Sequence, residues 1–367
     1  MKILWFTWKD IKNPLAGGAE VVGYEIAKQL TSNGHEVIFL VAGFKNGLSK
    51  EIIDGYAVIR LGNKWTVYWQ AYKYYKKNLI GWADVVIDEV NTIPFFTTFY
   101  VKEKKILFFH QLCREIWFYE SFFPLNLIGY LLEPFYLWSL SDGKVITVSE
   151  STKNDLLKCD FKLPNINIIS EGINLKPLED LNTVEKFTSP TLLSIGSIRQ
   201  MKRTIDILKA FEILKKKVKD AKLIIAGNAE SRYGRKLLHL LNRSIYKKDI
   251  EYLGKISSIE KEKLMQKSHI LLITSVKEGW GLVVTEANSQ GTPVVAYDAD
   301  GIRDSIQNGE TGIISRENNP ESLSDSVMDI FKDKNRYEKI RETAWRKSKE
   351  INFERSYNDF IKIIENI

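Results

Sequence analysis

Short apolar runs alternate with amphipathic segments along the chain, and this alternation constrains the fold more than any other feature. Residues 2–7 and 36–41 are apolar enough for buried strands. Between them, residues 19–31 have the spacing of an amphipathic helix, which Asn33-Gly34 ends in the manner of a C-cap. Strands and helices that alternate in this way form a mostly parallel sheet, so the pattern predicts an α/β fold.

The strand candidates form two series, one in each half of the chain. In the first half they are residues 2–7, 36–41, 57–61, 85–89, 105–109, 145–148 and 166–169. In the second half they are residues 191–195, 222–226, 251–253, 270–274, 293–296 and 312–314.

The break between the two series predicts two domains. A chain of 367 residues is also longer than one hydrophobic core usually supports. Residues 175–190 are polar, contain two prolines and have no regular period, so we interpret them as a linker between domains at 1–174 and 191–345. Residues 346–367 have a helical pattern with no strand after it, and we expect them to pack on a surface already formed.

The most informative motif is EGWGLVVTE, which places Glu278 and Glu286 on either side of a turn with two glycines. An apolar strand candidate precedes it, and a helical segment, 282–290, follows. The unpaired N–H groups at a helix N-terminus favour phosphate. Two carboxylates would repel a bare phosphate but can bind hydroxyl groups, so the motif favours a nucleotide sugar.

A basic segment, SIRQMKR, follows the first strand of the second domain and contains Arg199 and Lys202. Ligands of open α/β sheets bind at the carboxyl ends of the strands, and cations there would neutralise a diphosphate leaving group. A solvated basic start of a helix is the alternative, but the helix dipole disfavours cations at that end.

The first domain offers two weaker candidates. Gly17 and Gly18 lie at a strand-to-helix turn, where glycines let a ligand approach the backbone closely and expose N–H groups. A plain tight turn explains them equally well, and the pattern is not the GxGxxG of dinucleotide sites. His110 ends an apolar strand and is either a structural histidine or a ligand contact.

Net charge, cysteine content and the length of the apolar runs limit which ligands and which cellular compartment are expected. The net charge of +7 suits an anionic ligand, an anionic membrane surface or nucleic acid, but no nucleic-acid-binding signature is present. Cys113 and Cys159 are far apart, which argues for a reducing compartment and therefore the cytoplasm. No apolar run approaches the ~20 residues of a membrane span; residues 125–140 come nearest and are interrupted by Glu133 and Pro134.

Two aromatic-rich segments have no single assigned role, and one acidic motif is not expected to bind a metal. Residues 65–82 and 116–138 are rich in aromatic side chains, with lysines in the first; they would meet anionic lipid headgroups, pack in the core or bind a sugar. Asp298 and Asp300 resemble a metal-binding DxD motif, but no third ligand is near in sequence, so we expect no metal site.

Several of these segments together resemble one family. GGAEVVGYEIAKQLTSNGHEV, VITVSESTKNDLLK, IISEGIN and EGWGLVVTEANSQGTPVVAYDADGIRDSIQNGETGII are similar to segments of retaining GT-B glycosyltransferases of family GT4, the glycosyl transferases group 1. The resemblance covers most of the chain, and the last segment is the most specific. It implies two Rossmann-like domains facing across a cleft, with the C-terminal helix returning to the N-terminal domain.

The resemblance also implies roles for individual residues. Glu286 would bind the ribose of the donor and Glu278 the hydroxyls of its sugar. The donor phosphates would meet the amides of the turn at Gly281, Leu282 and Val283, and also Lys202. The remaining contacts would be Ile256 beside the base, Gly17 and Gly18 near the diphosphate, and His110 at the reacting sugar. The chain departs from the family at Ser197, where arginine is usual; Arg199 is the nearest basic residue.

The implied activity is transfer of a hexose-type sugar with retention of configuration. The donor would be a nucleotide sugar, UDP- or GDP-linked, and the acceptor a hydroxyl of a glycan or lipid-linked molecule. No metal and no further cofactor is implied, and the enzyme would work in the cytoplasm or at the inner face of the membrane. A nucleotide-sugar epimerase of the same fold and an inactive sugar-nucleotide-binding protein remain alternatives.

Overall fold

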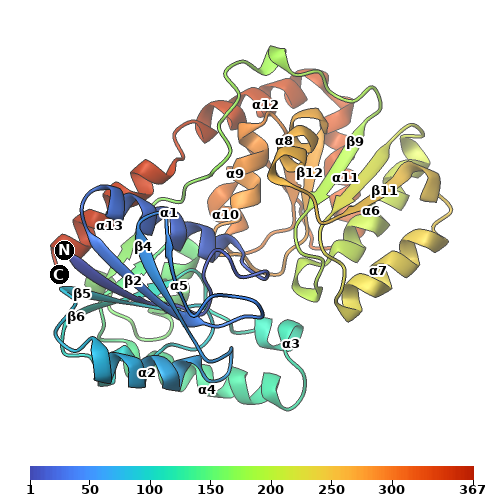
Figure 1. The fold of residues 1–367 in the computed structure, drawn as a ribbon. Helices are drawn as coiled ribbons and strands as arrows, with labels where there is room; N and C mark the ends of the chain where they lie inside the picture. Colours follow the sequence, from blue (N-terminus) through green and yellow to red (C-terminus); the bar gives the residue numbers. More distant parts are fainter. The chain divides into compact units, whose positions relative to one another are not determined.

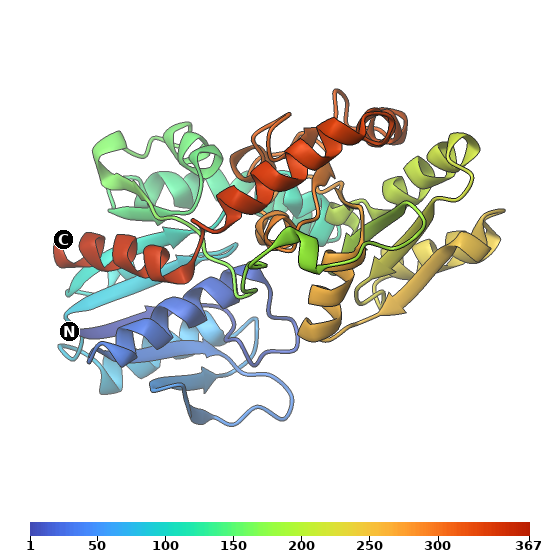
Figure 2. The same ribbon diagram turned by 90° about the horizontal axis from the view of Figure 1, so that it is seen from above.

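The computed structural model describes residues 1–367, which form two compact units. The first unit comprises Met1–Trp117, Phe122–Gly172 and Asn352–Ile367, and the second comprises Phe118–Ser121 and Ile173–Ile351. In each unit a sheet of mostly or wholly parallel strands lies between helices (Figures 1 and 2). The predicted α/β fold with two Rossmann-like domains is confirmed.

The first unit contains an eight-stranded sheet with the order β3-β4-β2-β1-β5-β6-β7-β8. Only β3 runs antiparallel to its neighbour, β4. The strands are β1 (Lys2–Phe6), β2 (Glu36–Ala42), β3 (Lys50–Ile53), β4 (Tyr56–Leu61), β5 (Val85–Val90), β6 (Lys104–Phe109), β7 (Val145–Thr147) and β8 (Ile166–Ile168). The helices are α1 (Gly18–Ser32), α2 (Val67–Asn78), α4 (Leu125–Leu140), α5 (Glu150–Leu157) and α13 (Phe353–Glu365). A short helix, α3 (Ile116–Glu120), is divided: its first two residues belong to this unit and the rest group with the second.

The register of the strands places α2 and α4 on one face of this sheet. Phe6 packs with α2, and Leu107 packs with α4. Phe6 pairs with Asp88 on β5, and Asp88 pairs with Leu107 on β6. Because paired residues of neighbouring strands point to the same face, both helices cover that face.

The other face carries α1 and α13. The ring of Phe360 on α13 stacks on Trp5 of β1 with centroids 5.4 Å apart, and Gln29 of α1 donates to the Phe353 carbonyl over 2.9 Å. Ser170 donates to Asp359 over 2.6 Å. The C-terminal helix therefore completes the first unit, opposite α2 and α4 (Figure 1).

The second unit contains a six-stranded parallel sheet with the order β11-β10-β9-β12-β13-β14. The strands are β9 (Thr191–Ile195), β10 (Lys222–Ala226), β11 (Ile250–Gly254), β12 (Ile270–Ile273), β13 (Val294–Ala296) and β14 (Gly312–Ile314). The helices are α6 (Thr204–Lys217), α7 (Arg232–Arg243), α8 (Ser258–Lys267), α9 (Leu282–Ser289), α10 (Ile302–Ser305), α11 (Pro320–Lys332) and α12 (Lys334–Ser348).

Helices pack on both faces of the second sheet through two hydrophobic cores. The larger joins the sheet to α6, α7, α11 and α12, and the smaller joins it to α8, α9 and α10. Residues 175–190, interpreted as a linker, form no strand and belong to this unit. Lys186 donates to the carbonyls of Ser268 and Gly291, each over 2.8 Å. None of the helices in either unit has the length and apolar content needed to cross a membrane.

Candidate active site

Two loops of the second unit meet because their strands, β9 and β12, are neighbours in the sheet. The loop after β9 contains a short 3₁₀ turn, Gln200–Lys202, and the loop after β12 leads into α9. The Val276 amide donates to the Met201 carbonyl over 2.8 Å, and Thr274 donates to the Lys202 carbonyl over 2.8 Å. These bonds fix the Lys202 backbone beside the EGWG turn.

Lys202 and Glu278, predicted from separate motifs, form an ion pair at this junction. Ser275 donates a hydrogen bond to the same carboxylate oxygen of Glu278 over 2.5 Å. Lys202 is 25% exposed and Glu278 is 16% exposed, so both side chains remain reachable from solvent. The pair is a preformed cation and anion at the carboxyl end of a parallel sheet, where ligands bind in folds of this class.

The turn between Glu278 and α9 requires glycine. Gly281 is the residue before α9 and has φ +90°, in the left-handed region. Gly301 has φ +78°, and a Cβ there would lie 2.2 Å from the Glu278 carbonyl oxygen. The Glu278 amide also donates to the Asp300 carbonyl over 3.0 Å, so the loop after β13 packs against the turn and holds its backbone in place.

The first amides of α9 are available for an anion. Leu282 and Val283 begin the helix, and the first N–H groups of an α-helix have no partner within it. The positive end of the helix dipole adds to the field of these amides and of Lys202. These groups are the ones that the predicted diphosphate would meet.

Glu286 lies one turn further along α9 and is paired with a residue that the sequence analysis missed. Lys261 of α8 lies 2.5 Å from the Glu286 carboxylate, and both side chains are partly buried. Ile256, predicted to border a base, is partly buried in the loop that leads from β11 to α8. Only the packing of α8 against α9 brings Lys261 to Glu286, so no spacing in the sequence indicates the pair.

Arg199 and the DxD aspartates have other partners. The Arg199 guanidinium lies 3.2 Å from the carboxylate of Glu120, a residue that groups with the second unit. Asp298 and Asp300 both accept hydrogen bonds from Arg303. Salt bridges to one arginine account for the positions of both aspartates.

In the first unit, the glycine turn is capped by its own helix. Gly17 precedes α1 and Gly18 begins it. The Glu20 carboxylate accepts a hydrogen bond from the Gly17 amide over 2.6 Å and lies 3.2 Å from the Lys9 ammonium. The expected exposure of N–H groups at this turn therefore does not hold for Gly17, because an acid in the first turn of α1 occupies its amide.

His110 follows β6 in a buried cluster of acids, all within the first unit. Its Nε2 lies 3.2 Å from Glu89, whose other oxygen accepts a hydrogen bond from the Trp5 indole over 2.6 Å. Burial alone would lower the His110 pKa, but the hydrogen bond to Glu89 and the negative charges of Glu89, Glu171 and Glu20 raise it above its usual value.

Glu171 is the least satisfied member of this cluster. It is 4% exposed, and its Oε2 has no hydrogen-bond partner. Burial raises its pKa to about 7, although the neighbouring His110 acts in the opposite direction. Glu89 and Glu171 were not predicted from the sequence, because only the order of the strands brings the end of β5 and the segment after β8 to His110.

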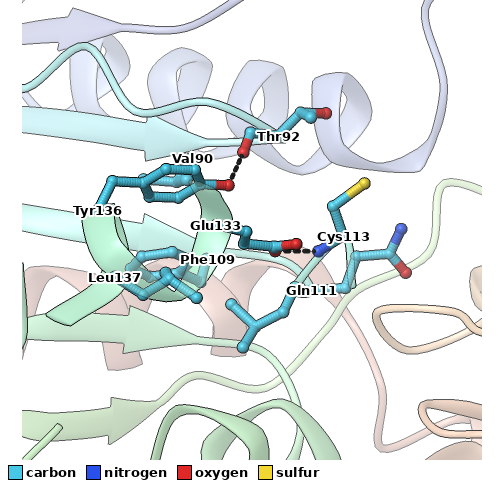
Figure 3. Close-up of a pocket in the computed structure, with 9 residues that line it drawn as sticks. Val90, Thr92, Phe109, Gln111, Cys113, Glu133, Tyr136 and Leu137 are labelled. Carbon is cyan, nitrogen blue, oxygen red and sulfur yellow. Dashed lines mark hydrogen bonds between the residues drawn. The ribbon is translucent and has the colours of Figure 1, made fainter. Parts of the chain in front are cut away.

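Figure 3 shows a pocket of the first unit that is separate from these residues. Tyr136 donates to the Thr92 carbonyl over 2.6 Å, and Glu133 accepts from the Cys113 amide over 2.8 Å. The space is too small to hold a ligand, and no predicted site residue lines it. These contacts hold α4 against the segments that follow β5 and β6.

Comparisons with known proteins agree with the fold and with the motifs. Residues 16–176 match the family model "Glycosyltransferase Family 4", and residues 180–347 match "Glycosyl transferases group 1". N-acetyl-alpha-D-glucosaminyl L-malate synthase of Bacillus anthracis is 25% identical over 362 residues, covering 90% of this chain and 89% of that protein.

Solved structures share the whole architecture. The sucrose-phosphate synthase of Thermosynechococcus elongatus has a TM-score of 0.82 at 16% identity, covering 100% of this chain and 98% of its own. An Anabaena protein, HepE, solved in complex with UDP and glucose, has a TM-score of 0.75 at 14% identity, with 100% of both chains covered. At these identities the likeness concerns the fold alone.

Proposed function

The chain belongs to glycosyltransferase family 4, with a group 1 domain in its second half, and we propose that it transfers a hexose-type sugar from a UDP- or GDP-linked donor with retention of configuration. The acceptor in this proposal is a hydroxyl of a glycan or of a lipid-linked molecule. A lipid-linked acceptor would suit an enzyme in contact with the cytoplasmic face of a membrane.

The Lys202–Glu278 ion pair beside the N-terminus of α9 is the observation that carries the proposal. A bound donor would place its diphosphate against the amides of Leu282 and Val283, and Lys202 would turn from Glu278 to the phosphate. Glu278 would then be free to accept hydrogen bonds from the sugar hydroxyls. Glu286 would bind the ribose hydroxyls, with Lys261 holding its carboxylate in place.

Catalysis in this proposal is electrostatic. As the bond from the anomeric carbon to the diphosphate breaks, Lys202 and the helix amides stabilise the growing negative charge. The leaving phosphate accepts the acceptor's proton on the same face of the sugar, which retains the configuration without an enzyme nucleophile. Lys202 supplies the positive charge that a metal supplies in other transferases, so the proposal requires no metal.

The first unit would contribute to the sugar and to the acceptor. Gly18, at the start of α1, is proposed to lie near the diphosphate, and His110 to contact the reacting sugar. With its pKa raised, His110 would donate a hydrogen bond to a sugar hydroxyl while Glu89 fixes the ring.

Kinetics of two variants test the proposed site. We expect Glu278→Ala and Lys202→Ala each to lower turnover by at least ~10²-fold, the scale of one lost transition-state contact. Lys217→Ala and Asp325→Ala are matched controls, since they break an exposed ion pair between α6 and α11 in the same unit. Control variants should keep wild-type turnover.

Two results would contradict the proposal. Near-wild-type turnover in both site variants would remove Lys202 and Glu278 from the chemistry. Conversion of the donor in the absence of any acceptor to a sugar epimer, detected by product analysis, would point to an epimerase.

A further inference from the structure

Helix α4 of the first unit exposes apolar side chains to solvent and buries its one charged side chain, the reverse of an ordinary surface helix. Its outward side carries Leu127, Ile128, Leu131, Leu132, Phe135 and Trp138, all of them exposed. Phe135 is 68% exposed and Trp138 is 67% exposed. These positions recur at spacings of three and four residues, so they form one continuous apolar stripe. Large contiguous apolar patches on soluble proteins mark sites of interaction.

The only charged side chain of α4 points inward. Glu133 is 1% exposed and accepts hydrogen bonds from the amides of Cys113 and Arg114 over 2.8 and 2.6 Å. It also accepts one from the Trp117 indole over 3.0 Å. The buried carboxylate is therefore fully used in holding the segment after β6, and no charged side chain of α4 lies in the outward stripe.

Helix α2 covers the same face of the sheet, as the strand register establishes, and its outward side is aromatic and basic. Trp65, just before α2, and Trp69 within it are both exposed. Lys64 and Lys73 lie over these two rings, at 4.8 Å from each centroid. Lys76 and Lys77 extend the positive charge, and residues 64–82 contain no acidic residue.

Aromatic contacts join α2 to α4 across the segment between them. Tyr68 of α2 packs on Phe95 at 4.7 Å, and the next residue, Phe96, packs on Tyr136 of α4 at 6.2 Å. Helices α2 and α4 cover the same face of the sheet (Figure 1). Their exposed side chains therefore belong to one outer layer, here called the α2–α4 surface.

We propose that the α2–α4 surface docks on a membrane that contains anionic lipid. The apolar stripe of α4 enters the boundary between headgroups and acyl chains, while Trp65 and Trp69 lie at headgroup level. Lysines 64, 73, 76 and 77 bind the anionic headgroups. Large apolar side chains next to lysines, with acids turned inward, are the composition of surfaces that lie in a membrane interface.

The positive charge of α2 favours an anionic membrane over a second copy of the chain as the partner of this surface. In a two-fold dimer the same patch would face itself. Both copies would then bring the lysines of α2 to one interface with no exposed acid on either helix to neutralise them, and this accumulation of positive charge opposes association. An anionic membrane satisfies both the apolar stripe and the lysines. This inference does not depend on the transferase assignment.

Vesicle sedimentation with the full chain tests the proposal. The vesicles are phosphatidylcholine alone or an equal mixture of phosphatidylcholine and phosphatidylglycerol. We expect wild type to bind the mixed vesicles at least about tenfold more tightly than the neutral ones, and added salt to weaken that binding. The variants are Leu131→Asp with Phe135→Asp for the stripe, and Lys73→Gln with Lys76→Gln and Lys77→Gln for the charge.

Each variant set has a distinct expected result. The stripe variant should lose binding to both kinds of vesicle, whereas the lysine variant should bind mixed vesicles no better than neutral ones. Ile245→Asp is the matched control, because Ile245 is an exposed isoleucine of the second unit, and it should bind as wild type does. Circular dichroism and donor binding, unchanged in every variant, would show that the chains are folded.

Two outcomes would overturn the proposal. Wild type that stays in the supernatant with mixed vesicles would contradict membrane docking. A wild-type dimer in sedimentation velocity that the stripe variant converts to a monomer, without any vesicle binding, would assign the surface to a second copy. Loss of turnover with vesicle binding intact would instead concern the transferase proposal alone.

Discussion

Burial of the Glu171 carboxyl group makes the stability of the protein depend on pH. The pKa of this carboxyl is about 7 in the folded first unit, against 4.5 for an unperturbed glutamate. The folded state thus holds this proton more tightly than the unfolded state does. Its contribution is neutral at low pH, becomes unfavourable as the pH rises from about 4.5 to about 7, and is constant above that.

Replacement of Glu171 by glutamine should therefore stabilise the protein, and more so at high pH. We expect Glu171→Gln to raise the free energy of unfolding by up to about 3 kcal/mol at pH 8 and by close to zero at pH 4. Urea unfolding at the two pH values measures this difference. Glu115→Gln, at an exposed position, is the control. An equal effect of Glu171→Gln at both pH values would show that the carboxyl is not protonated on folding.

Gly301 lies against the backbone of Glu278. Alanine substitutions at Gly301 and at Gly309 distinguish the cost of a steric clash from the cost of a left-handed backbone conformation. Gly301 has φ +78° and faces the Glu278 carbonyl, whereas Gly309 has φ +84° with nothing near its absent Cβ. We expect Gly309→Ala to cost about 1–2 kcal/mol from the left-handed conformation alone. Gly301→Ala should cost at least about 1 kcal/mol more, from overpacking, and should also weaken donor binding. Equal losses in thermal melts and unchanged donor affinity would contradict this packing of Gly301 against Glu278.

Residue patterns identified the parts of the candidate site that belong to a recognisable motif, including Lys202 and Glu278 from two separate motifs. Glu278, Gly281 and Glu286 share one turn and one helix, so their spacing was enough to predict an anion site. Ser275 lies only three residues before Glu278 and was missed because a single serine there has no distinctive pattern. Lys261 and the acids Glu89 and Glu171 were missed because α8, the end of β5 and the segment after β8 supply them. Their proximity follows from the order of the strands, which no single motif encodes.

Helix α13 is an element whose contribution to stability can be measured. Its Phe360 is fully buried against Trp5 and Phe108 of the first sheet. We expect Phe360→Ala to cost about 3–5 kcal/mol, the usual cost of removing a buried aromatic ring. Unfolding in urea, followed by tryptophan fluorescence, measures the loss. Ile363→Ala, half-buried on the same helix, should cost clearly less, and an equal loss for both would argue against the stacked position of Phe360.

At the scale of elements, most strands could be predicted within one or two residues because buried parallel strands are continuous apolar runs. The missed strand, β3, is a four-residue edge strand with two charged residues, and only Ile53 is buried. Asp54 and Gly55, both with positive φ, turn it into β4. Helix α4 was recognised as apolar, but which side faces solvent depends on Glu133 and its partners.

The whole molecule should respond to its donor in a way that identifies the nucleotide. In a thermal-shift series of UDP-, GDP-, ADP- and TDP-sugars, the true donor at 100 times its dissociation constant should stabilise the chain by about 2.7 kcal/mol. EDTA should leave both this shift and the turnover unchanged, since Lys202 supplies the charge in our proposal. A shift that disappears with EDTA and returns with a divalent cation would contradict metal independence.

The two-unit organisation could be predicted because the β-α alternation stops and restarts. The sequence could not predict that residues 175–190 would be held so firmly by the second unit. Their polar composition suggested a linker, but Lys186 is partly buried and donates hydrogen bonds to carbonyls more than 80 residues away. A lysine that binds distant carbonyls has no signature in the local sequence.

The return of the chain at Asn352 has a consequence for its biosynthesis. The first unit lacks one of its packed helices until α13 has left the ribosome, whereas the second unit has all of its residues by Ile351. The half that is translated first is therefore the last to become complete. During that interval Trp5 and Phe108 lack the Phe360 ring that packs against them, and a chaperone that recognises exposed aromatic surface would find its binding site there.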